Sequence, residues 1–179
     1  MGFEPTEPKR LTTFRVSRTR PDYATSPSNM NIMKYKSDEE KMEVALAEAR
    51  KALEIDEIPV GAVIVYENQV IARGHNQSKR LNDSTAHAEM IAITSAQNTI
   101  GSRYLNDCEL YVTLEPCMMC SGAIYLSKIP KVIYALDDKQ KGYLRNSKLE
   151  YNKKIDIISN VLEEESKELL NTFFFKLRS

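Results

Sequence analysis

Apolar positions along most of the chain recur with alternating helical and strand periods. A capping box of Ser37 and Glu40 precedes an apolar stripe at helical spacing, which predicts an amphipathic helix over 38–54. A β-branched run predicts a strand over 60–66. A turn at 67–69 then predicts that 70–73 returns as the second strand of a hairpin.

The remainder of the chain continues this alternation. We expect helices over 86–98 and 117–127, and strands over 109–114, 132–135 and 155–159. Asn160 with Glu163 predicts the cap of a last helix. The apolar stripe of that helix consists of Leu162, Leu169, Leu170, Phe173, Phe174 and Leu177. Strands that alternate with helices predict a layered α/β domain.

The first 29 residues lack both periods and contain four of the chain's seven prolines. Such a segment buries too little apolar surface to offset its ordering entropy. We therefore interpret 1–29 as a disordered extension or an artefact of an overlong gene model, with a basic transit peptide as an open alternative. Residues 30–179 are predicted to form a single domain.

Composition narrows the class of protein. A chain of 179 residues with 42% hydrophobic residues can form a core. No apolar run approaches the ~20 residues of a membrane-spanning helix, so we expect no membrane partner. Basic and acidic residues balance at 25 each, and the total charge therefore indicates no partner. Three cysteines are too few for a disulfide scaffold, and the spacing of Cys117 and Cys120 suggests a metal or redox pair.

Two short segments contain the residue types that bind and use a metal ion. The first includes His87 and Glu89, the second includes Pro116, Cys117 and Cys120, and each opens a predicted helix. Cysteines three positions apart leave the same face of a helical turn, and a helix N-terminus favours the thiolate form. Because zinc prefers thiolates and neutral imidazole, the sequence predicts a zinc ion bound by His87, Cys117 and Cys120.

Three protein ligands leave one zinc position for water, as in catalytic rather than structural sites. Zinc lowers the pKa of such a water to about 7, and Glu89 is well placed to act as its general base. Two other interpretations stay open. The cysteines could form a redox pair, which gives His87 and Glu89 no role. They could also belong to a structural zinc site with Cys108 or His75 as a further ligand.

The His-Ala-Glu and Pro-Cys-x-x-Cys segments resemble the signature of the zinc-dependent cytidine and deoxycytidylate deaminase superfamily. A closer resemblance, over 38–178, is to the bacterial tRNA-specific adenosine deaminase family. It rests on the stretches 57–63, 74–76, 85–89 and 110–123. The zinc motifs belong to the whole superfamily and do not by themselves separate adenosine in tRNA from guanine or cytosine.

The resemblance implies a three-layer cytidine deaminase-like fold, in which helices flank a five-stranded mixed sheet. It also implies a cytoplasmic homodimer with one zinc ion per subunit. The implied reaction is the hydrolytic deamination of adenosine to inosine at the wobble position of a tRNA anticodon. In that reaction zinc-activated hydroxide attacks the base, and Glu89 shuttles protons.

The resemblance further assigns substrate contacts. Asn76 matches a residue that hydrogen-bonds the nucleoside, Pro59 and Val60 match the base pocket, and Asp138 matches an RNA-backbone contact. Each has a structural alternative: a turn for Asn76 and Asp138, and the start of a buried strand for Pro59 and Val60. The backbone N–H groups of Ala88 and Cys117 are candidate donors to the substrate.

The end of the chain favours an RNA substrate. Phenylalanines at 173–175 cannot all face one core, because successive helical residues are about 100° apart. An exposed ring would stack on an unpaired base, and Phe174 is our candidate, although dimer or core packing would also use aromatic surface.

Local charge favours the same substrate. Between 128 and 154, eight basic residues stand against three acidic ones, giving a net charge of +5. The basic residues are Lys128, Lys131, Lys139, Lys141, Arg145, Lys148, Lys153 and Lys154. A surface of this kind attracts phosphates, and a solvated lysine-rich loop is the alternative. The competing functions are a small-molecule guanine or cytosine deaminase and a non-catalytic, zinc-stabilised RNA-binding module.

Overall fold

The computed structural model describes residues 34–143 and 154–178 and folds them into five strands and four helices. The extension predicted over 1–29 lies outside the described residues. The elements in chain order are α1 (Asp38–Glu54), β1 (Gly61–Tyr66), β2 (Gln69–His75), α2 (Ala88–Ile100), β3 (Cys108–Leu114), α3 (Met118–Leu126), β4 (Lys131–Leu136), β5 (Asp156–Ile158) and α4 (Glu163–Lys176). None of these helices is both long and apolar enough to cross a membrane.

The strands form one mixed sheet in the order β2-β1-β3-β4-β5. Strand β1 is antiparallel to β2 and β3, whereas β3, β4 and β5 run parallel. Glu67 and Asn68 have φ angles of 48° and 63°, the type I′ geometry that suits a two-residue hairpin turn. Because Leu114 pairs with Leu136, β3 and β4 end at the same edge of the sheet. The expected five-stranded mixed sheet is thereby confirmed.

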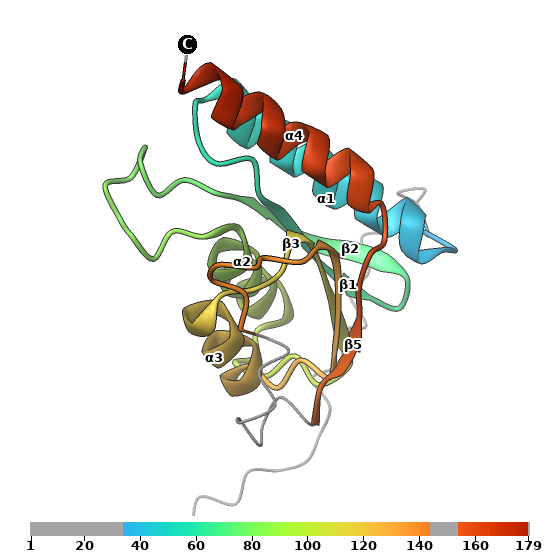
Figure 1. Cartoon of the computed structure of the whole chain (residues 1–179). Coiled ribbons are helices and arrows are strands. Elements are labelled where there is room, and N and C mark those ends of the chain that lie inside the picture. Colours follow the sequence, from blue (N-terminus) through green and yellow to red (C-terminus); the bar gives the residue numbers. More distant parts are fainter. Residues whose placement is uncertain (1–33, 144–153, 179) are drawn as a thin grey trace, which may run out of the picture. The chain divides into compact units, whose positions relative to one another are not determined.

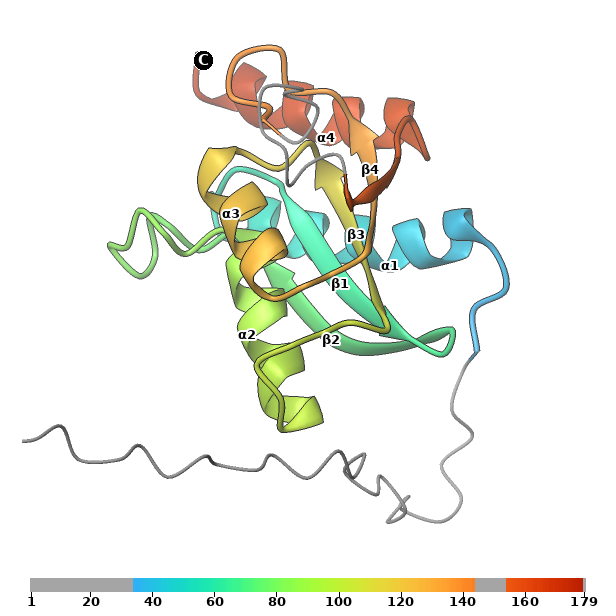
Figure 2. The same cartoon turned by 90° about the horizontal axis from the view of Figure 1, so that it is seen from below.

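Helices cover both faces of this sheet and give the expected three layers (Figures 1 and 2). Helices α2 and α3 pack on one face, and α1 and α4 pack on the other. The side chains of β1 alternate between these faces: Ala62 and Ile64 join the core beneath α2 and α3, whereas Val63 and Val65 join the core beneath α1. Burial on both faces explains why β1 is apolar at every position rather than at alternate positions.

The starts of the first three helices follow the sequence prediction closely. At α1 the capping box is formed, since Glu40 N donates to Ser37 Oγ at 3.2 Å and Ser37 N donates to Glu40 Oε2 at 3.4 Å. Helices α2 and α3 each begin one or two residues later than predicted, because His87 and Cys117 are extended N-cap residues rather than helical ones.

The start of α4 differs from the prediction. Asn160 does not cap this helix; the N-cap residue is Leu162, which has a left-handed backbone with φ 57° and makes no side-chain cap. Three consecutive acidic residues, Glu163 to Glu165, occupy the first turn instead. Their charges interact favourably with the free N–H groups there. The predicted apolar stripe is only partly buried, because Phe174 and Leu177 are exposed.

Glycine at the sheet surface lets a helix approach closely. A Cβ atom on Gly74 of β2 would lie 2.5 Å from Ala88 O and 2.8 Å from Ala92 N, both in the backbone of α2. Gly61 of β1 meets the backbone of α1 at Ala45 in the same way. Since backbone atoms cannot rotate aside, these glycines set how close α1 and α2 lie to the sheet.

We predict that Gly74→Ala destabilises the protein by about 1–3 kcal/mol, because the added methyl group must push α2 away from the sheet. The matched control is Gly122→Ala in α3, where an added Cβ meets nothing within 4 Å. Alanine is a better helix former than glycine, so this control should be as stable as wild type or more stable. Thermal unfolding measures both, and equal stability of the two variants would contradict the close packing described above.

Candidate active site

A cleft of about 990 Å³ opens where β3 and β4 end. The cleft is lined by segments from 56–60, 76–89, 114–117 and 136–141 and by the inner side of α4. It receives His87, Glu89 and Cys117 from the segments singled out in the sequence, together with Asn76, Val60, Asp138 and Phe174. The carboxyl ends of parallel strands are a common position for ligand sites.

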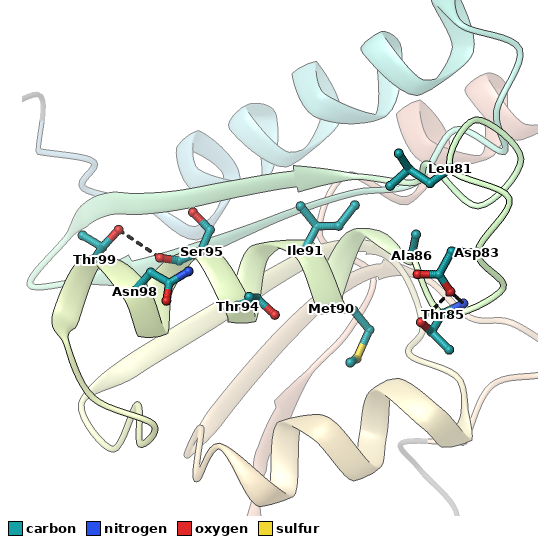
Figure 3. A pocket seen from close by; sticks show the side chains of 10 residues that line it. All are labelled: Leu81, Asp83, Thr85, Ala86, Met90, Ile91, Thr94, Ser95, Asn98 and Thr99. Carbon is teal, nitrogen blue, oxygen red and sulfur yellow. Dashed lines mark hydrogen bonds between the residues drawn. The ribbon is translucent and has the colours of Figure 1, made fainter.

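A second, more open hollow runs along the outer side of α2 (Figure 3). It contains none of the predicted catalytic residues, but it shows how the loop before His87 is held. Asp83 Oδ1 accepts hydrogen bonds from Thr85 N at 2.8 Å and Thr85 Oγ1 at 2.7 Å (Figure 3). These bonds lower the pKa of Asp83 and fix the turn that leads into α2.

The three predicted zinc ligands lie together at the ends of two helices. His87 precedes α2, Cys117 precedes α3, and Cys120 lies in the first turn of α3, where it is fully buried. His87 Nδ1 is 3.7 Å from Cys117 Sγ and 3.5 Å from Cys120 Sγ. Tetrahedral zinc with ordinary bond lengths places nitrogen and sulfur ligands roughly 3.6 Å apart. The donor set therefore fits zinc in both chemistry and spacing.

The other candidate ligands lie elsewhere. His75 Nδ1 is 3.2 Å from Glu48 Oε2 of α1, and Cys108 lies at the far end of β3 from Cys117. Within 34–143 and 154–178, His87, Cys117 and Cys120 are the only group of His, Cys, Asp or Glu side chains found close enough together to hold a metal ion. The structural-zinc interpretation with Cys108 or His75 as a further ligand is therefore wrong. Among the described residues this donor set supplies three ligands, one fewer than a tetrahedral zinc ion takes.

Hydrogen bonds among the ligands favour a thiolate. The pKa of Cys117 is lowered to about 3, because its sulfur accepts hydrogen bonds from Cys120 and from His87. The pKa of His87 is raised by the same bond to Cys117. Cys120 donates to Cys117 and is buried, and both effects raise its pKa. A bound cation would take the place of the protons shared by these three groups.

Glu89 is the acidic residue in the first turn of α2, and only 4% of its surface is exposed. Burial raises the pKa of its carboxyl group above the ordinary value. The side chain lines the cleft beside His87 and Cys117, and it does not belong to the cluster of ligand atoms. This position suits a group that moves protons next to the metal without binding it.

Only some of the residues predicted to contact the nucleoside line the cleft. Asn76 and Val60 line the cleft, and both are buried. Ala88 is fully buried in the core beneath α2, so only its backbone is available to a ligand. Pro59 is buried and is not among the residues that line the cleft. The base-pocket role of Pro59 stays a prediction that the geometry does not favour.

Two buried glutamates of the cleft were not predicted as site residues. Glu57 accepts hydrogen bonds from Asn76 Nδ2 and from the backbone N–H of Arg80. Glu115 accepts a hydrogen bond from the backbone N–H of Asp138 at 3.2 Å. In the sequence both appear as ordinary charged residues next to strands. Only their position beside an apolar run and a proline could have suggested burial.

The loop after β4 is attached to the cysteine segment. Tyr143 N donates to Pro116 O at 3.0 Å, and Gly142 forms a bridge with Cys117. Asp138 Oδ1 accepts from Gln140 N at 2.9 Å and from Lys141 N at 3.0 Å, so its carboxylate organises its own turn. A contact of Asp138 with RNA stays a prediction.

The phenylalanine side chains at 173–175 project in different directions, as helical geometry requires. Phe173 is buried, whereas 45% of Phe174 and 72% of Phe175 are exposed. Phe174 lies edge to face with Phe173, with ring centroids 5.4 Å apart, and lines the cleft. The expectation that at least one of these rings faces outward is confirmed, and Phe174 is the exposed ring that reaches the cleft.

Four lysines line the cleft and are called the rim lysines here: Lys79, Lys139, Lys141 and Lys167. They come from the loop between β2 and α2, the loop after β4, and α4. Only two of them lie in the segment whose charge was counted above. The sequence count therefore missed Lys79 and Lys167, which the fold brings to the same opening.

The same count included lysines from the wrong end of the sheet. Lys128 lies over the ring of Tyr104 at 4.0 Å, and Lys131 Nζ is 3.3 Å from Glu109 Oε1. Both precede or begin β4, whereas the cleft lies where β4 ends, and neither residue lines the cleft. Arg145, Lys148 and Lys153 lie outside the described residues.

Comparisons with known proteins agree with this geometry. Residues 35–136 match the model of the cytidine and deoxycytidylate deaminase zinc-binding region. A tRNA-specific adenosine deaminase of Aquifex aeolicus is 46% identical over 145 residues, which cover 77% of this chain and 94% of that protein. A solved structure from a study of A-to-I editing by tRNA:A34 deaminases at the wobble position is 42% identical, with a TM-score of 0.68, covering 72% of this chain and 97% of that one.

The comparisons also include an enzyme for a small substrate. The structure of a guanine deaminase from Bacillus subtilis is 40% identical, with a TM-score of 0.55. It covers 57% of this chain and 66% of that one. The similarity to this guanine deaminase therefore extends over less of both chains than the similarity to the tRNA deaminase structure.

We predict that the purified protein holds one zinc ion per chain and that Cys120→Ala loses it. Loss of a direct ligand should weaken binding by more than the roughly 10–100-fold that loss of an outer partner typically costs. The matched control is Cys108→Ala, because Cys108 is also buried but lies outside the ligand cluster, and burial raises its pKa to about 11. Metal analysis after dialysis measures both; zinc loss in the control would show that a different site is occupied.

Proposed function

Because the chain belongs to the cytidine and deoxycytidylate deaminase family of zinc-binding proteins, we propose that it hydrolyses adenosine to inosine at the wobble position of a tRNA anticodon. The observation that carries this proposal is the placement of buried Glu89 beside the cluster of His87, Cys117 and Cys120, in a cleft whose opening holds lysines and an exposed ring. The function of the named tRNA deaminases supports the substrate.

His87, Cys117 and Cys120 would hold the zinc ion. When bound, zinc supplies Lewis-acid chemistry that makes a water-derived nucleophile available at neutral pH. The water is consumed, its oxygen becomes bonded to C6 of the adenine ring, and the C6 amino group leaves as ammonia. The protons of this reaction must be moved by the protein's own residues.

Glu89 moves those protons. Its carboxylate first accepts a proton from the attacking water and delivers it to N1 of the ring. It then accepts the proton of the new C6 hydroxyl and passes it to the departing amino group. Burial favours this role, because a raised pKa brings the carboxyl group closer to neutral pH, where it can both accept and donate. The backbone N–H groups of Ala88 and Cys117 are suited to orient the base edge.

The opening of the cleft is suited to RNA. The target base is unpaired in an anticodon loop, so its extrusion costs little. The rim lysines lie around the opening, where phosphates of the flanking nucleotides would pass, and the Phe174 ring offers a stacking surface for a neighbouring base. Because the proposed tRNA substrate is found in the cytoplasm, we assign the protein to that compartment.

We also propose that two copies associate. Helix α3 exposes Met118, Tyr125 and Leu126 at 63%, 45% and 71%, respectively. Leu81, Met90 and Ile91 line the hollow along α2 in Figure 3. A second copy would cover these apolar side chains together with those of α3. Met118 follows the zinc ligand Cys117, so this surface begins next to the site.

The second candidate function is deamination of free guanine, and the observation in its favour is the 40% identity to the Bacillus subtilis guanine deaminase. Deamination of a free base would need the three zinc ligands and Glu89, but it would not need the rim lysines or Phe174. The non-catalytic RNA-binding module does not account for a buried carboxyl group beside the ligand cluster.

We predict that Glu89→Ala and the closer mimic Glu89→Gln keep zinc but lose inosine formation by about 10²–10⁴-fold, since proton transfer by a positioned group contributes this much. The measurement is inosine content of a matched anticodon stem-loop after incubation, alongside zinc content by metal analysis. Turnover at the wild-type rate in either variant would remove Glu89 from the reaction.

We predict that Phe174→Ala lowers kcat/KM for the stem-loop by about 5–100-fold, the range expected for one stacking contact. Reversing Lys139 and Lys141 to Glu should lower kcat/KM further and reduce its salt dependence, because phosphate contacts are lost. The matched controls are Phe175→Ala and Lys128→Glu, which alter exposed or distant residues that do not line the cleft. The second candidate function would be favoured if the enzyme deaminated free guanine faster than the stem-loop and if the Phe174 and lysine substitutions did not alter that rate.

A further inference from the structure

Glu57 joins two segments of the cleft through its carboxylate. Its side chain is buried, with 3% exposed, in the loop between α1 and β1. Oε2 accepts a hydrogen bond from Asn76 Nδ2 at 2.9 Å, and Oε1 accepts one from the backbone N–H of Arg80 at 2.6 Å. Its own backbone N–H donates to Ala52 O at 2.9 Å, which fixes the loop to the end of α1.

Asn76 is held from its other side as well. Its backbone N–H donates to Val60 O at 3.0 Å, and its Oδ1 accepts from Ser78 Oγ at 3.1 Å. A carboxamide can turn end over end and exchange its donor and acceptor ends at almost no steric cost. Here a carboxylate lies at the nitrogen end and a hydroxyl donor lies at the oxygen end, so one of the two orientations is strongly favoured.

This arrangement leaves capacity for a ligand. A carboxamide has two N–H hydrogens and two oxygen lone pairs. Within 34–143 and 154–178, the Asn76 side chain uses one of each. Asn76 lines the cleft, so its second N–H and second lone pair are the groups that a nucleoside would meet. Their order in space depends on which way the amide is turned.

We infer that Glu57 is a positioning residue that fixes the Asn76 carboxamide in the orientation read by the substrate. The inference rests on the proposed function for the identity of the substrate, but the orientation of Asn76 is a property of the protein alone. Glu57 does this without touching the substrate, by accepting from Asn76 and from Arg80 at the same time.

Glu57→Gln isolates this role because it keeps the shape of the side chain. Glutamine has one acceptor oxygen in place of two. Because the two donors contact different oxygens of the Glu57 carboxylate, glutamine cannot accept from both in this geometry. Since the Arg80 N–H belongs to the backbone and cannot turn, the glutamine oxygen should stay with it and present its NH₂ group to Asn76. Asn76 would then turn over, and Ser78 would redirect its hydroxyl to Ala86 O, which lies 3.5 Å away.

The test is a double-mutant cycle on the zinc-loaded enzyme with the anticodon stem-loop. Glu57→Gln should lower kcat/KM by about 10–100-fold, because the reversed Asn76 carboxamide would present a donor where the substrate needs an acceptor, and an acceptor where it needs a donor. In an Asn76→Ala background the same change should have an effect within about twofold, because the residue through which it acts is gone. Independent, additive losses would overturn the inference.

Two further variants separate positioning from folding. Glu48→Gln removes another buried carboxylate, whose polar partners Lys51 and His75 do not line the cleft, and it should keep full activity. Ser78→Ala removes the donor at the other end of Asn76. It should give a smaller loss that also disappears in the Asn76→Ala background. A loss in Ser78→Ala that persists there would count against the inference, even if Glu57→Gln fails to fold.

A spectroscopic readout needs no substrate. The side-chain amide resonances of Asn76, identified by their disappearance in Asn76→Ala, should shift clearly in Glu57→Gln and stay unchanged in Glu48→Gln. Unchanged Asn76 resonances in folded Glu57→Gln would overturn the inference. If wild-type enzyme forms no inosine, the proposed function fails, and these resonances still decide whether Glu57 orients Asn76.

Discussion

Two helices must begin side by side at one edge of the sheet, and the rest of the site depends on this constraint. The N-cap positions of α2 and α3 are His87 and Cys117, so the ligand atoms are brought together by the starting points of the helices. Parallel pairing of β3 with β4 places the start of α3 at this edge, and the glycine contact between β2 and α2 sets the approach of the other helix. Helix N-termini also favour negative charge, which suits both thiolate and carboxylate groups.

The fold was largely predictable because the apolar periods are strong and long. Strands β1, β3 and β4 are buried on both faces or nearly so, and the capping box at Ser37 is a local signal that needs no tertiary information. The start of α4 was not predictable in this way, because a left-handed residue at Leu162 reflects how the chain must turn onto the sheet. No local pattern favours leucine in that conformation.

The cluster of candidate metal ligands was predictable for a different reason. Histidine and cysteine are rare in this chain, and their spacing has few structural explanations. The lysines at the opening of the cleft were harder to predict, because charge along the sequence does not show at which end of a strand a lysine lies. Lys131 and Lys139 are close in sequence but lie at opposite ends of β4, whereas Lys79 and Lys167 come together only in the fold. Glu57 was missed because burial of a carboxylate beside a particular asparagine is a tertiary property.

The attachment of 138–143 to the cysteine segment bears on how this scaffold can diversify. The turn organised by Asp138, the bridge between Gly142 and Cys117, and the bond from Tyr143 to Pro116 make the lysine-bearing loop and a metal ligand one mechanical unit. Insertions or deletions within that stretch would displace a thiolate along with the lysines. New substrate preferences should therefore arise by exchange of side chains within this stretch rather than by changes in its length.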